Sequence, residues 1–307
     1  NSNSNSSSSS SSKGKRRAPM TKQEMMKLWK GLFYCMWMAD KAPVQRELAV
    51  NIAGLALSLD PAWAFEMYCR CFFQTMAREW SRLDRFRLDK FYSLVRFMVR
   101  NVLRRAARVG WSLASCRQVM ALLAEEIFGI DSVPRGLQLH FCDIYLEEMN
   151  AAALVKDDHS GRAADDETAL RKLDTEKFLY LLTPIFYILS GDIGAGGRMQ
   201  QAIFRRAVDR VILPFIKGKR GSDKAPRFPG VDAAVLQWAL FELAGSDATL
   251  DGNREPLFAL NEELAKVTKK QFVEDGPEDM ELPDILTQTS APAEDDDDDD
   301  DDDEEEE

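Results

Sequence analysis

The sequence predicts an all-α protein, built as an α-solenoid or as an irregular array of antiparallel helix pairs. Signals for helix starts recur about every twenty residues in the first half of the chain, which is the length of one long helix and a turn. The second half continues with apolar residues at helical spacing, and no alternating strand pattern extends beyond a few residues. The connections are short and no alternation of strand and helix patterns, as in a βαβ fold, is present, which favours packed helix pairs.

The first helices are marked by their start signals. Thr21 and Glu24 have the spacing of a capping box, and apolar residues follow at helical spacing. Pro43 and Pro61 stand where a proline is tolerated in the first turn of a helix, so both indicate helix starts. Two further boundaries are marked by turn and capping residues: Gly110 with Ser112, and Ser132 with Pro134.

The second half contains five more predicted helices, at 137–154, 176–189, 199–216, 231–243 and 255–267. Two polar insertions, 156–168 and 217–230, interrupt them and are expected to form loops. The domain organisation that we predict is a disordered Ser-rich and basic segment at 1–19, a helical repeat-like domain at 20–274, and a disordered acidic tail at 275–307. The chain does not begin with Met, which indicates a further N-terminal segment.

The net charge of −11 is distributed very unevenly along the chain. Residues 13–120 hold 21 Lys and Arg against 8 Asp and Glu, whereas residues 121–293 hold 19 against 29. The last 14 residues, 294–307, are all acidic. A basic front and a polyacidic end point to polyelectrolyte partners rather than to a small-molecule substrate.

The cysteines indicate a reducing compartment. There are 5 of them, an odd number, and no CxxC pair occurs, so we expect buried thiols rather than disulfides or zinc ligands. The longest apolar runs, 48–59 and 178–189, are too short to span a bilayer, so no membrane partner is expected.

The segment 82–108 carries the strongest functional signal. At about 100° per residue its apolar residues fall on one stripe: Phe91, Val95, Met98, Val102 and Ala106. Arginines at intervals of four residues fall on the opposite side, about 6 Å apart along the helix axis. This arginine ridge consists of Arg96, Arg100, Arg104 and Arg108, with Arg85 at its edge.

A solvated helix face is the plain alternative for such a run of charge. Solvated faces normally mix both signs, whereas no acidic residue follows Asp89 before Gly110. Arginine dominates over lysine, which favours bidentate phosphate contacts, and Phe97 projects close to the ridge, where a base or a partner protein could cover it. We therefore expect the ridge to bind RNA or an acidic partner, and to contact RNA by backbone and shape because no RNA-recognition or KH motif is present.

Three other charged segments carry weaker signals. Lys217, Lys219 and Arg220 lie in the insertion 217–230, which is either a second RNA contact or a solvated loop. A nuclear-import signal or a nucleic-acid arm is a candidate role for a short basic cluster: Lys13, Lys15, Arg16 and Arg17. The acidic tail is a solubilising appendage, a competitor for the arginine ridge, or a binder of basic proteins.

No catalytic, cofactor or metal site is predicted. His140 and Cys142 are two residues apart on a helix and so face different ways, and His159 lies in a polar insertion. The glycine-rich run 191–197 follows a helix rather than a strand and lacks the GK[ST] ending of a phosphate loop, so we interpret it as a helix stop. The residues supply no nucleophile, base and orienting group together, so we expect a protein that is not an enzyme.

Two stretches resemble the eukaryotic ribosomal RNA processing protein 1 family: KLWKGLFYCMWMADKAPVQRELA at 27–49 and RLDRFRLDKFYSLVRFMVRN at 82–101. The region 20–243 is compatible with that family over most of its length. The resemblance implies a HEAT-like helical fold, a nucleolar location, and residence in early pre-60S particles, where the protein is needed for processing the large-subunit precursor RNA. It also implies other assembly factors and ribosomal proteins as partners.

A different class of function remains open beside this scaffold role. The alternative is a nuclear chaperone or transport adaptor whose acidic tail, 275–307, holds basic cargo proteins. Deletion of the tail discriminates between the two, because cargo binding depends on the tail and association with pre-ribosomes does not.

Overall fold

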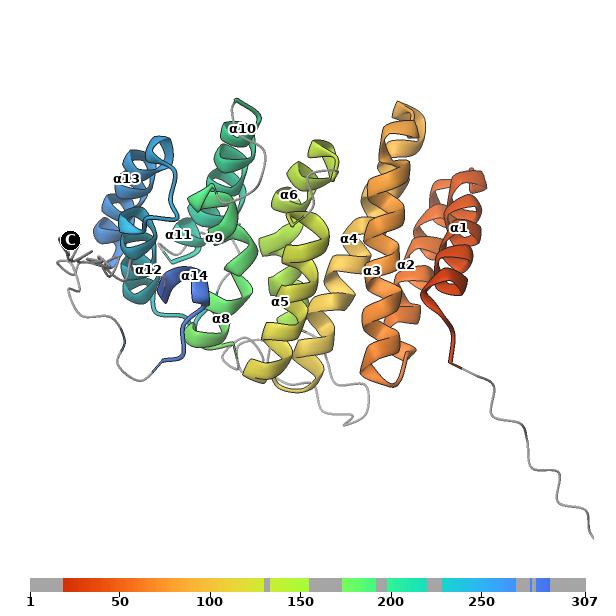
Figure 1. The fold of residues 1–307 in the computed structure, drawn as a ribbon, viewed down its shortest axis with the longest axis horizontal. Coiled ribbons are helices and arrows are strands. Elements are labelled where there is room, and N and C mark those ends of the chain that lie inside the picture. The colour runs from red at the N-terminus through yellow and green to blue at the C-terminus, as the bar shows by residue number, and fades with distance from the viewer. Residues whose placement is uncertain are drawn as a thin grey trace, which may run out of the picture.

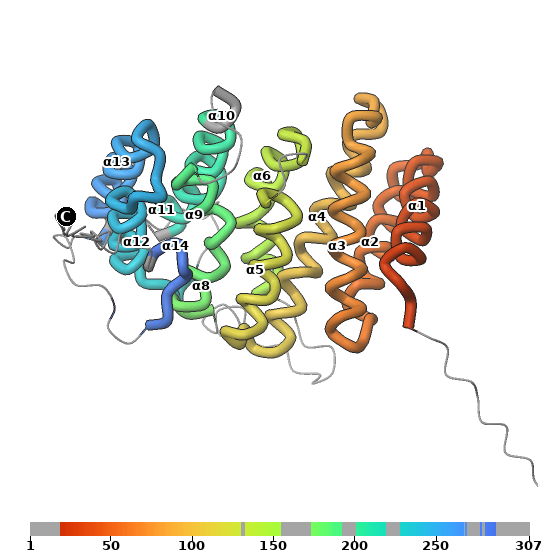
Figure 2. The backbone as a smooth tube through the Cα atoms, viewed as in Figure 1, coloured from red at the N-terminus to blue at the C-terminus, as the bar shows by residue number. Residues whose placement is uncertain are grey.

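A computed structural model of the 307-residue chain describes residues 19–129, 133–154, 173–191, 198–219, 228–268, 277 and 280–287. Within these ranges the protein is helical and contains no strand, which confirms the predicted fold class. The helices stand side by side in a row, with α1 and α2 at one end and α12 and α13 at the other (Figure 1). The backbone runs from one end of the row to the other, helix pair after helix pair (Figure 2).

The row consists of two layers, in each of which a helix contacts the next one along. The first layer contains α1 (Lys22–Met38), α3 (Ala62–Glu79), α5 (Leu113–Ile127), α8 (Thr175–Leu181), α9 (Thr183–Ser190) and α12 (Ala233–Gly245). The second contains α2 (Ala42–Ser58), α4 (Arg85–Arg108), α6 (Arg135–Ala153), α10 (Arg198–Ala207), α11 (Leu213–Lys219) and α13 (Asp251–Thr268). This arrangement is that of an α-solenoid, in which each helix pair buries its apolar face against its neighbours.

The predicted start signals have the expected local structure. The Thr21 N–H donates to Glu24 Oε2 at 2.8 Å and the Glu24 N–H donates to Thr21 Oγ1 at 3.3 Å, so the capping box is present. Pro43 lies in the first turn of α2, and Pro61 immediately precedes α3. Gly110 ends the turn after α4 with a φ of 71°, which is accessible to glycine at little cost.

Two of the predicted helices are interrupted, in both cases by a proline. The helix expected at 176–189 is split into α8 and α9, because Pro184 cannot donate a backbone hydrogen bond and stands in the first turn of α9. The helix expected at 199–216 contains a π-helical turn, η2 (Val208–Ile212). Pro214 would clash with the carbonyl four residues earlier in a regular α-helix, and the wider turn before it removes that conflict.

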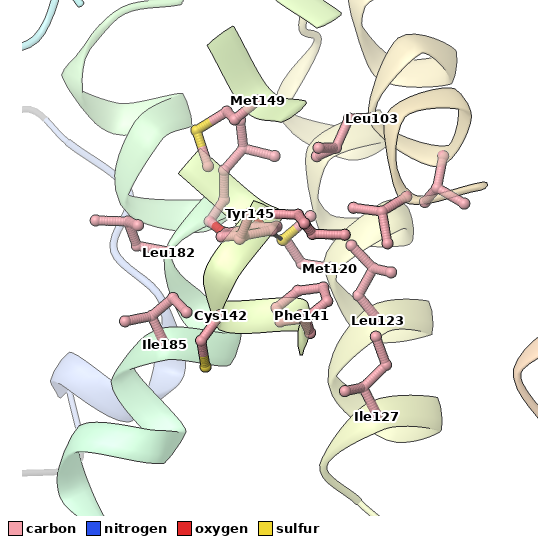
Figure 3. Packing of buried hydrophobic residues seen from close by; sticks show 14 of the residues in the cluster. Leu103, Met120, Leu123, Ile127, Phe141, Cys142, Tyr145, Met149, Leu182 and Ile185 are labelled. Carbon is pink, nitrogen blue, oxygen red and sulfur yellow. Dashed lines mark hydrogen bonds between the residues drawn. The ribbon is translucent and has the colours of Figure 1, made fainter. Parts of the chain in front are cut away.

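Helix α6 is fixed against the first layer by an aromatic core. Phe141 and Tyr145 stack at 4.6 Å between their ring centroids, and the Tyr145 hydroxyl donates to the Leu181 carbonyl. Figure 3 shows both rings directed at the apolar side chains of α5, among them Met120 and Leu123. The apolar side of α6 is therefore fixed by packing. The polar residues on the opposite side of the same helix are held at defined positions as a result.

Part of the segment that we expected to be a disordered acidic tail is packed. A short helix, α14 (Asp284–Thr287), contacts α9 and α12, and its Ile285 and Leu286 are buried (Figure 1). The Tyr180 hydroxyl donates to the Leu282 carbonyl at 2.9 Å. The prediction for 275–307 was thus wrong at 281–287, because three apolar residues within an acidic stretch are enough to hold one turn against the first layer.

The predicted insertions fall mostly outside the described residues. The described part of 217–230 is ordered: α11 continues to Lys219, and Phe228 is buried against Phe178 and Phe215. None of the helices in the described ranges has both the length and the apolar character needed to cross a membrane.

Candidate nucleic-acid interface

Helix α4 lies in the middle of the second layer, between α2 and α6. Its predicted apolar stripe, from Phe91 to Ala106, is completely buried. Burial extends well beyond the stripe, to Leu94, Val99 and Leu103, because α5 covers a further side of the helix. Only a narrow strip of α4 therefore reaches the outer surface, and the arginine ridge lies along this strip.

Two arginines of the ridge are tied to α6. Arg96 Nε lies 2.5 Å from Glu148 Oε1, and Arg100 Nη2 lies 3.0 Å from the same oxygen. Arg100 Nε also contacts Glu148 Oε2. The Glu148 side chain is 0% exposed, whereas Arg96 is 38% and Arg100 is 25% exposed. The ridge is therefore half-buried at these positions and is neutralised in part by a fully buried carboxylate.

At Arg96, the effect of burial opposes the effect of the neighbouring carboxylates. Burial by itself lowers the pKa of Arg96, but the hydrogen bonds and charge of Glu148 and Glu147 raise it, and the net result is a pKa above the ordinary value. Glu147, which is exposed, forms an ion pair with Arg96 at the surface. Acidic residues are thus scarce near the ridge in sequence but not in space, because acids from α6 approach it.

The rest of the ridge is more open. Arg108 is exposed and donates from Nη1 to the Leu57 carbonyl at 3.1 Å, and Arg104 is half-buried. Arg85 is exposed, with its guanidinium 4.6 Å from the ring centroid of Phe86. Arg85 and Arg108 retain the accessibility that the sequence predicted for them, whereas Arg104 is half-buried and its Nε atom is shielded from solvent.

Phe97 does not form an open platform. Its ring is only 9% exposed, because the guanidinium groups of Arg46 and Arg100 lie 5.6 and 5.4 Å from its centroid. Our expectation that a base or a partner protein could cover Phe97 is therefore corrected, since side chains of α2 and α4 cover it already.

The acidic residues of α6 hold arginines on its other side as well. Asp143 accepts two hydrogen bonds from Arg206 Nη1, at 2.8 and 2.9 Å, and its Oδ1 lies 3.3 Å from Arg210 Nε. An arginine belt, defined as Arg46, Arg96, Arg100, Arg206 and Arg210, thus runs across α2, α4, α10 and η2. Its five positive charges exceed the four negative charges of the carboxylates that act on it: Asp143, Glu147, Glu148 and Asp209.

The belt contains residues that the sequence analysis missed. Arg206 and Arg210 have the same four-residue spacing as the ridge and could have been recognised by it. Arg46 offered no such signal, since its place in the belt depends on how α2 packs on α4.

The other predicted basic residues are only partly described. Lys217 is exposed on α11, and Lys219 ends that helix, but the side chain of Lys219 lies outside the described residues. So do all the remaining residues of the two predicted basic segments: Arg220, Lys13, Lys15, Arg16 and Arg17.

The groups that could carry other chemistry are engaged in packing. His140 Nε2 lies 3.0 Å from the Tyr92 carbonyl oxygen, and burial lowers the pKa of His140. Burial raises the pKa of the Cys116 and Cys142 thiols to about 12. Cys35, which we expected to be buried, is exposed. No group of three or more His, Cys, Asp or Glu within the described part of the chain is placed to hold a metal ion.

Comparison with known proteins gives a family match over nearly the whole chain. Residues 6–306 match the family described as nucleolar protein Nop52. The chain is 43% identical over 141 residues to ribosomal RNA processing protein 1 homolog A of Mus musculus, covering 45% of this chain and 28% of that protein. It is 42% identical over 130 residues to the Homo sapiens homolog A, covering 42% and 28%.

A longer alignment exists with a more distant protein. The chain is 26% identical over 276 residues to the ribosomal RNA processing protein 1 homolog of Dictyostelium discoideum, which covers 82% of this chain and 53% of that protein. The chain thus spans about half of the Dictyostelium protein, and its match spans 28% of the mouse and human relatives.

Proposed function

Because the chain belongs to the Nop52 family of nucleolar proteins, we propose that it acts in ribosome biogenesis, in the nucleolus, as a non-catalytic scaffold. The names of its relatives, which are ribosomal RNA processing proteins, support this role. In the specific form of the proposal, the protein resides in early pre-60S particles and is needed for processing the large-subunit precursor RNA. There it binds the RNA backbone, other assembly factors and ribosomal proteins.

The observation that carries the RNA contact is the arginine belt on the outer surface of the second layer. Carboxylates of α6 fix the direction of the guanidinium groups, and the planar fork of arginine matches the geometry of a phosphate. Exposed Arg108, Arg205 and Lys217 add positive charge on the same layer. Such a surface suits contact with the backbone and shape of RNA rather than with base edges.

A charge-matched pair of variants tests this surface. The belt variant carries Arg46→Gln and Arg210→Gln in the arginine belt and Lys217→Gln on the same layer, which removes three positive charges at accessible positions and leaves Glu148 and its partners intact. The control carries three added glutamates at exposed positions of α5: Ala114→Glu, Gln118→Glu and Ala121→Glu. Both variants lower the net charge by three, so the control accounts for the change in overall charge.

The measurement is the affinity for single-stranded pre-ribosomal RNA as a function of salt concentration. The loss of three phosphate contacts should reduce the slope of log affinity against log salt by about 2 for the belt variant, at about 0.7 per contact. The control should retain the wild-type slope. Equal slopes for both variants, with the helical content unchanged, would contradict an RNA contact at the belt.

The run of 14 acids at 294–307 favours one alternative, a nuclear chaperone or transport adaptor for basic proteins. Deletion of 294–307 separates the two functions. The scaffold proposal predicts that association with pre-ribosomal particles survives the deletion. Loss of ribosomal-protein or histone binding together with loss of that association would favour the chaperone.

A further inference from the structure

A second basic surface lies on the opposite layer, in a groove between α1 and α3. The groove has a volume of about 400 Å³, within the roughly 300–1,000 Å³ range of small-ligand sites. Its floor includes Met26 and Phe33 from α1 and Thr75 from α3. Residues at intervals of three and four line it from both helices, so it follows the helix axes as an elongated channel.

The rim of the groove is basic. Lys27 and Lys30 lie on the α1 side, and Arg78 and Arg82 lie on the side of α3 and the turn that follows it. Glu79 is the one acidic residue among the described residues that line the groove. Four positive charges against one negative charge give the groove a net positive charge, which favours an anionic ligand.

Glu79 positions the two arginines rather than cancelling the whole rim. Its Oε1 lies 2.8 Å from Arg78 Nε, and its Oε2 lies 3.1 Å from Arg82 Nη1. The hydrogen bond from Arg78, together with the charges of both arginines, holds the pKa of Glu79 below its ordinary value. The guanidinium groups remain accessible, with half or more of each arginine side chain exposed.

An aromatic side chain stands beside these charges. Tyr34 lines the groove and is 51% exposed, so its ring is accessible to a ligand. The ring of Phe33, below it, packs edge-on against Tyr34 at 5.9 Å between centroids. An accessible ring over an apolar floor, with cations at the rim, is the arrangement that binds an unpaired base and its flanking phosphates.

We infer that the α1–α3 groove binds single-stranded RNA, with one unpaired base on Tyr34 and the neighbouring phosphates at Lys27, Lys30 and Arg82. This inference deepens the proposed function and rests on the chain binding RNA at all. It adds a site that recognises unpaired nucleotides, whereas the arginine belt lacks an accessible ring beside its charges because Phe97 is covered.

A second hollow, on the first layer, does not compete for this role. It has a volume of about 610 Å³ and lies between α5, α9 and the segment before α14. Its charged lining includes Arg117 together with three acids: Glu125, Glu281 and Asp284. A polyanion is repelled there, and the α1–α3 groove is the basic one of the two.

The test compares two substitutions of the same residue in the full chain. Tyr34→Ala removes the ring, and Tyr34→Phe keeps it, so the second variant controls for the first. The probes are a fluorescein-labelled oligoadenylate of about twelve nucleotides, within the site sizes of single-strand binders, and a duplex RNA of the same length. Affinity is measured by fluorescence anisotropy at several salt concentrations.

Tyr34→Ala should weaken binding of the single strand by roughly 5- to 150-fold, which corresponds to the loss of one base–aromatic stack. Tyr34→Phe should bind like the wild type, and the duplex affinity should be the same for all three proteins. Replacing Lys27 and Lys30 together by Gln should reduce the salt slope for the single strand by about 1.4.

The outcomes separate this inference from the proposed function. If the wild type binds the single strand and Tyr34→Ala binds it with the same affinity, the inference about the groove is wrong and the proposed RNA contact at the belt still stands. Failure of the wild type to bind either probe overturns both. If Tyr34→Ala keeps the wild-type RNA affinity but no longer associates with particles in cells, the groove binds a protein partner. That result also overturns the inference.

Discussion

Replacing Glu148 by Gln removes the negative charge between Arg96 and Arg100 while keeping the shape of the side chain. Glu148 is 0% exposed and accepts three hydrogen bonds from the two arginines. Loss of one partner of a buried ion pair costs about 3–5 kcal/mol. Arg96 and Arg100 are 38% and 25% exposed, so water can solvate them in part, and we reduce the expected cost to about 2–3 kcal/mol.

The matched control is Glu147→Gln, the neighbouring acid that pairs with Arg96 at the exposed surface. Surface pairs contribute about 0–1 kcal/mol, so this variant should be nearly as stable as the wild type. Urea unfolding followed by circular dichroism gives the free energy of unfolding for both. A difference between the two variants of less than about 0.5 kcal/mol, which is the usual range for surface substitutions, would refute a stabilising role for the buried carboxylate.

The same substitution should act in the opposite direction on RNA. Glu148→Gln removes one negative charge from the arginine belt, so the folded variant should bind single-stranded RNA more tightly than the wild type at low salt. Stability and affinity thus change with opposite signs, which a general loss of structure cannot produce. Weaker RNA binding by the folded variant would contradict the assignment of the belt.

Three further predictions concern stability and reactivity. Gly136→Ala should destabilise the protein by about 1–3 kcal/mol, because the new Cβ would lie 2.8 Å from Trp80 Nε1. Gly54→Ala should stabilise it by about 0.5–1 kcal/mol, because no atom lies within 4 Å of the new Cβ. Thermal unfolding measures both changes. Iodoacetamide should modify Cys35 in the native chain and spare the four buried thiols; mass spectrometry that finds a second modified cysteine would contradict the described packing. Burial lowers the pKa of His140 from 6.5, so the unfolded chain takes up this proton at a higher pH than the folded chain. The free energy of unfolding therefore falls as the pH drops below about 6.5, and His140→Asn should make this fall shallower between pH 7 and 5.5 in urea titrations; equal falls would count against the burial of the ring.

The local parts of the fold could be predicted from the sequence because they depend on neighbouring residues. The Thr21–Glu24 capping box and the buried stripe of α4 follow from spacings of three and four residues. The helix breaks at Pro184 and Pro214 could also be predicted from the sequence, since each follows from the missing N–H of proline. The helices predicted at 176–189 and 199–216 extend the apolar periodicity through both prolines.

The composition of the arginine belt could not be predicted in the same way. Periodicity shows which residues share a face of one helix, but not which helix lies opposite that face. Glu148 is 52 residues from Arg96 in sequence, and Asp143 is 63 residues from Arg206. Their pairing is decided by the order of the helices in the second layer. The packing of α14 depends likewise on the surface that α9 and α12 offer to three apolar residues.

The ion pairs of the belt also have a mechanical consequence. They tie α4 to α6 and α6 to α10 and η2 along the outer surface of the second layer, where a change in solenoid curvature alters the spacing between helices. A phosphate that takes Arg210 from Asp143 loosens one of these ties. We therefore expect the stiffness of the solenoid to fall when the ionic strength rises or when the proposed RNA contact occupies this surface.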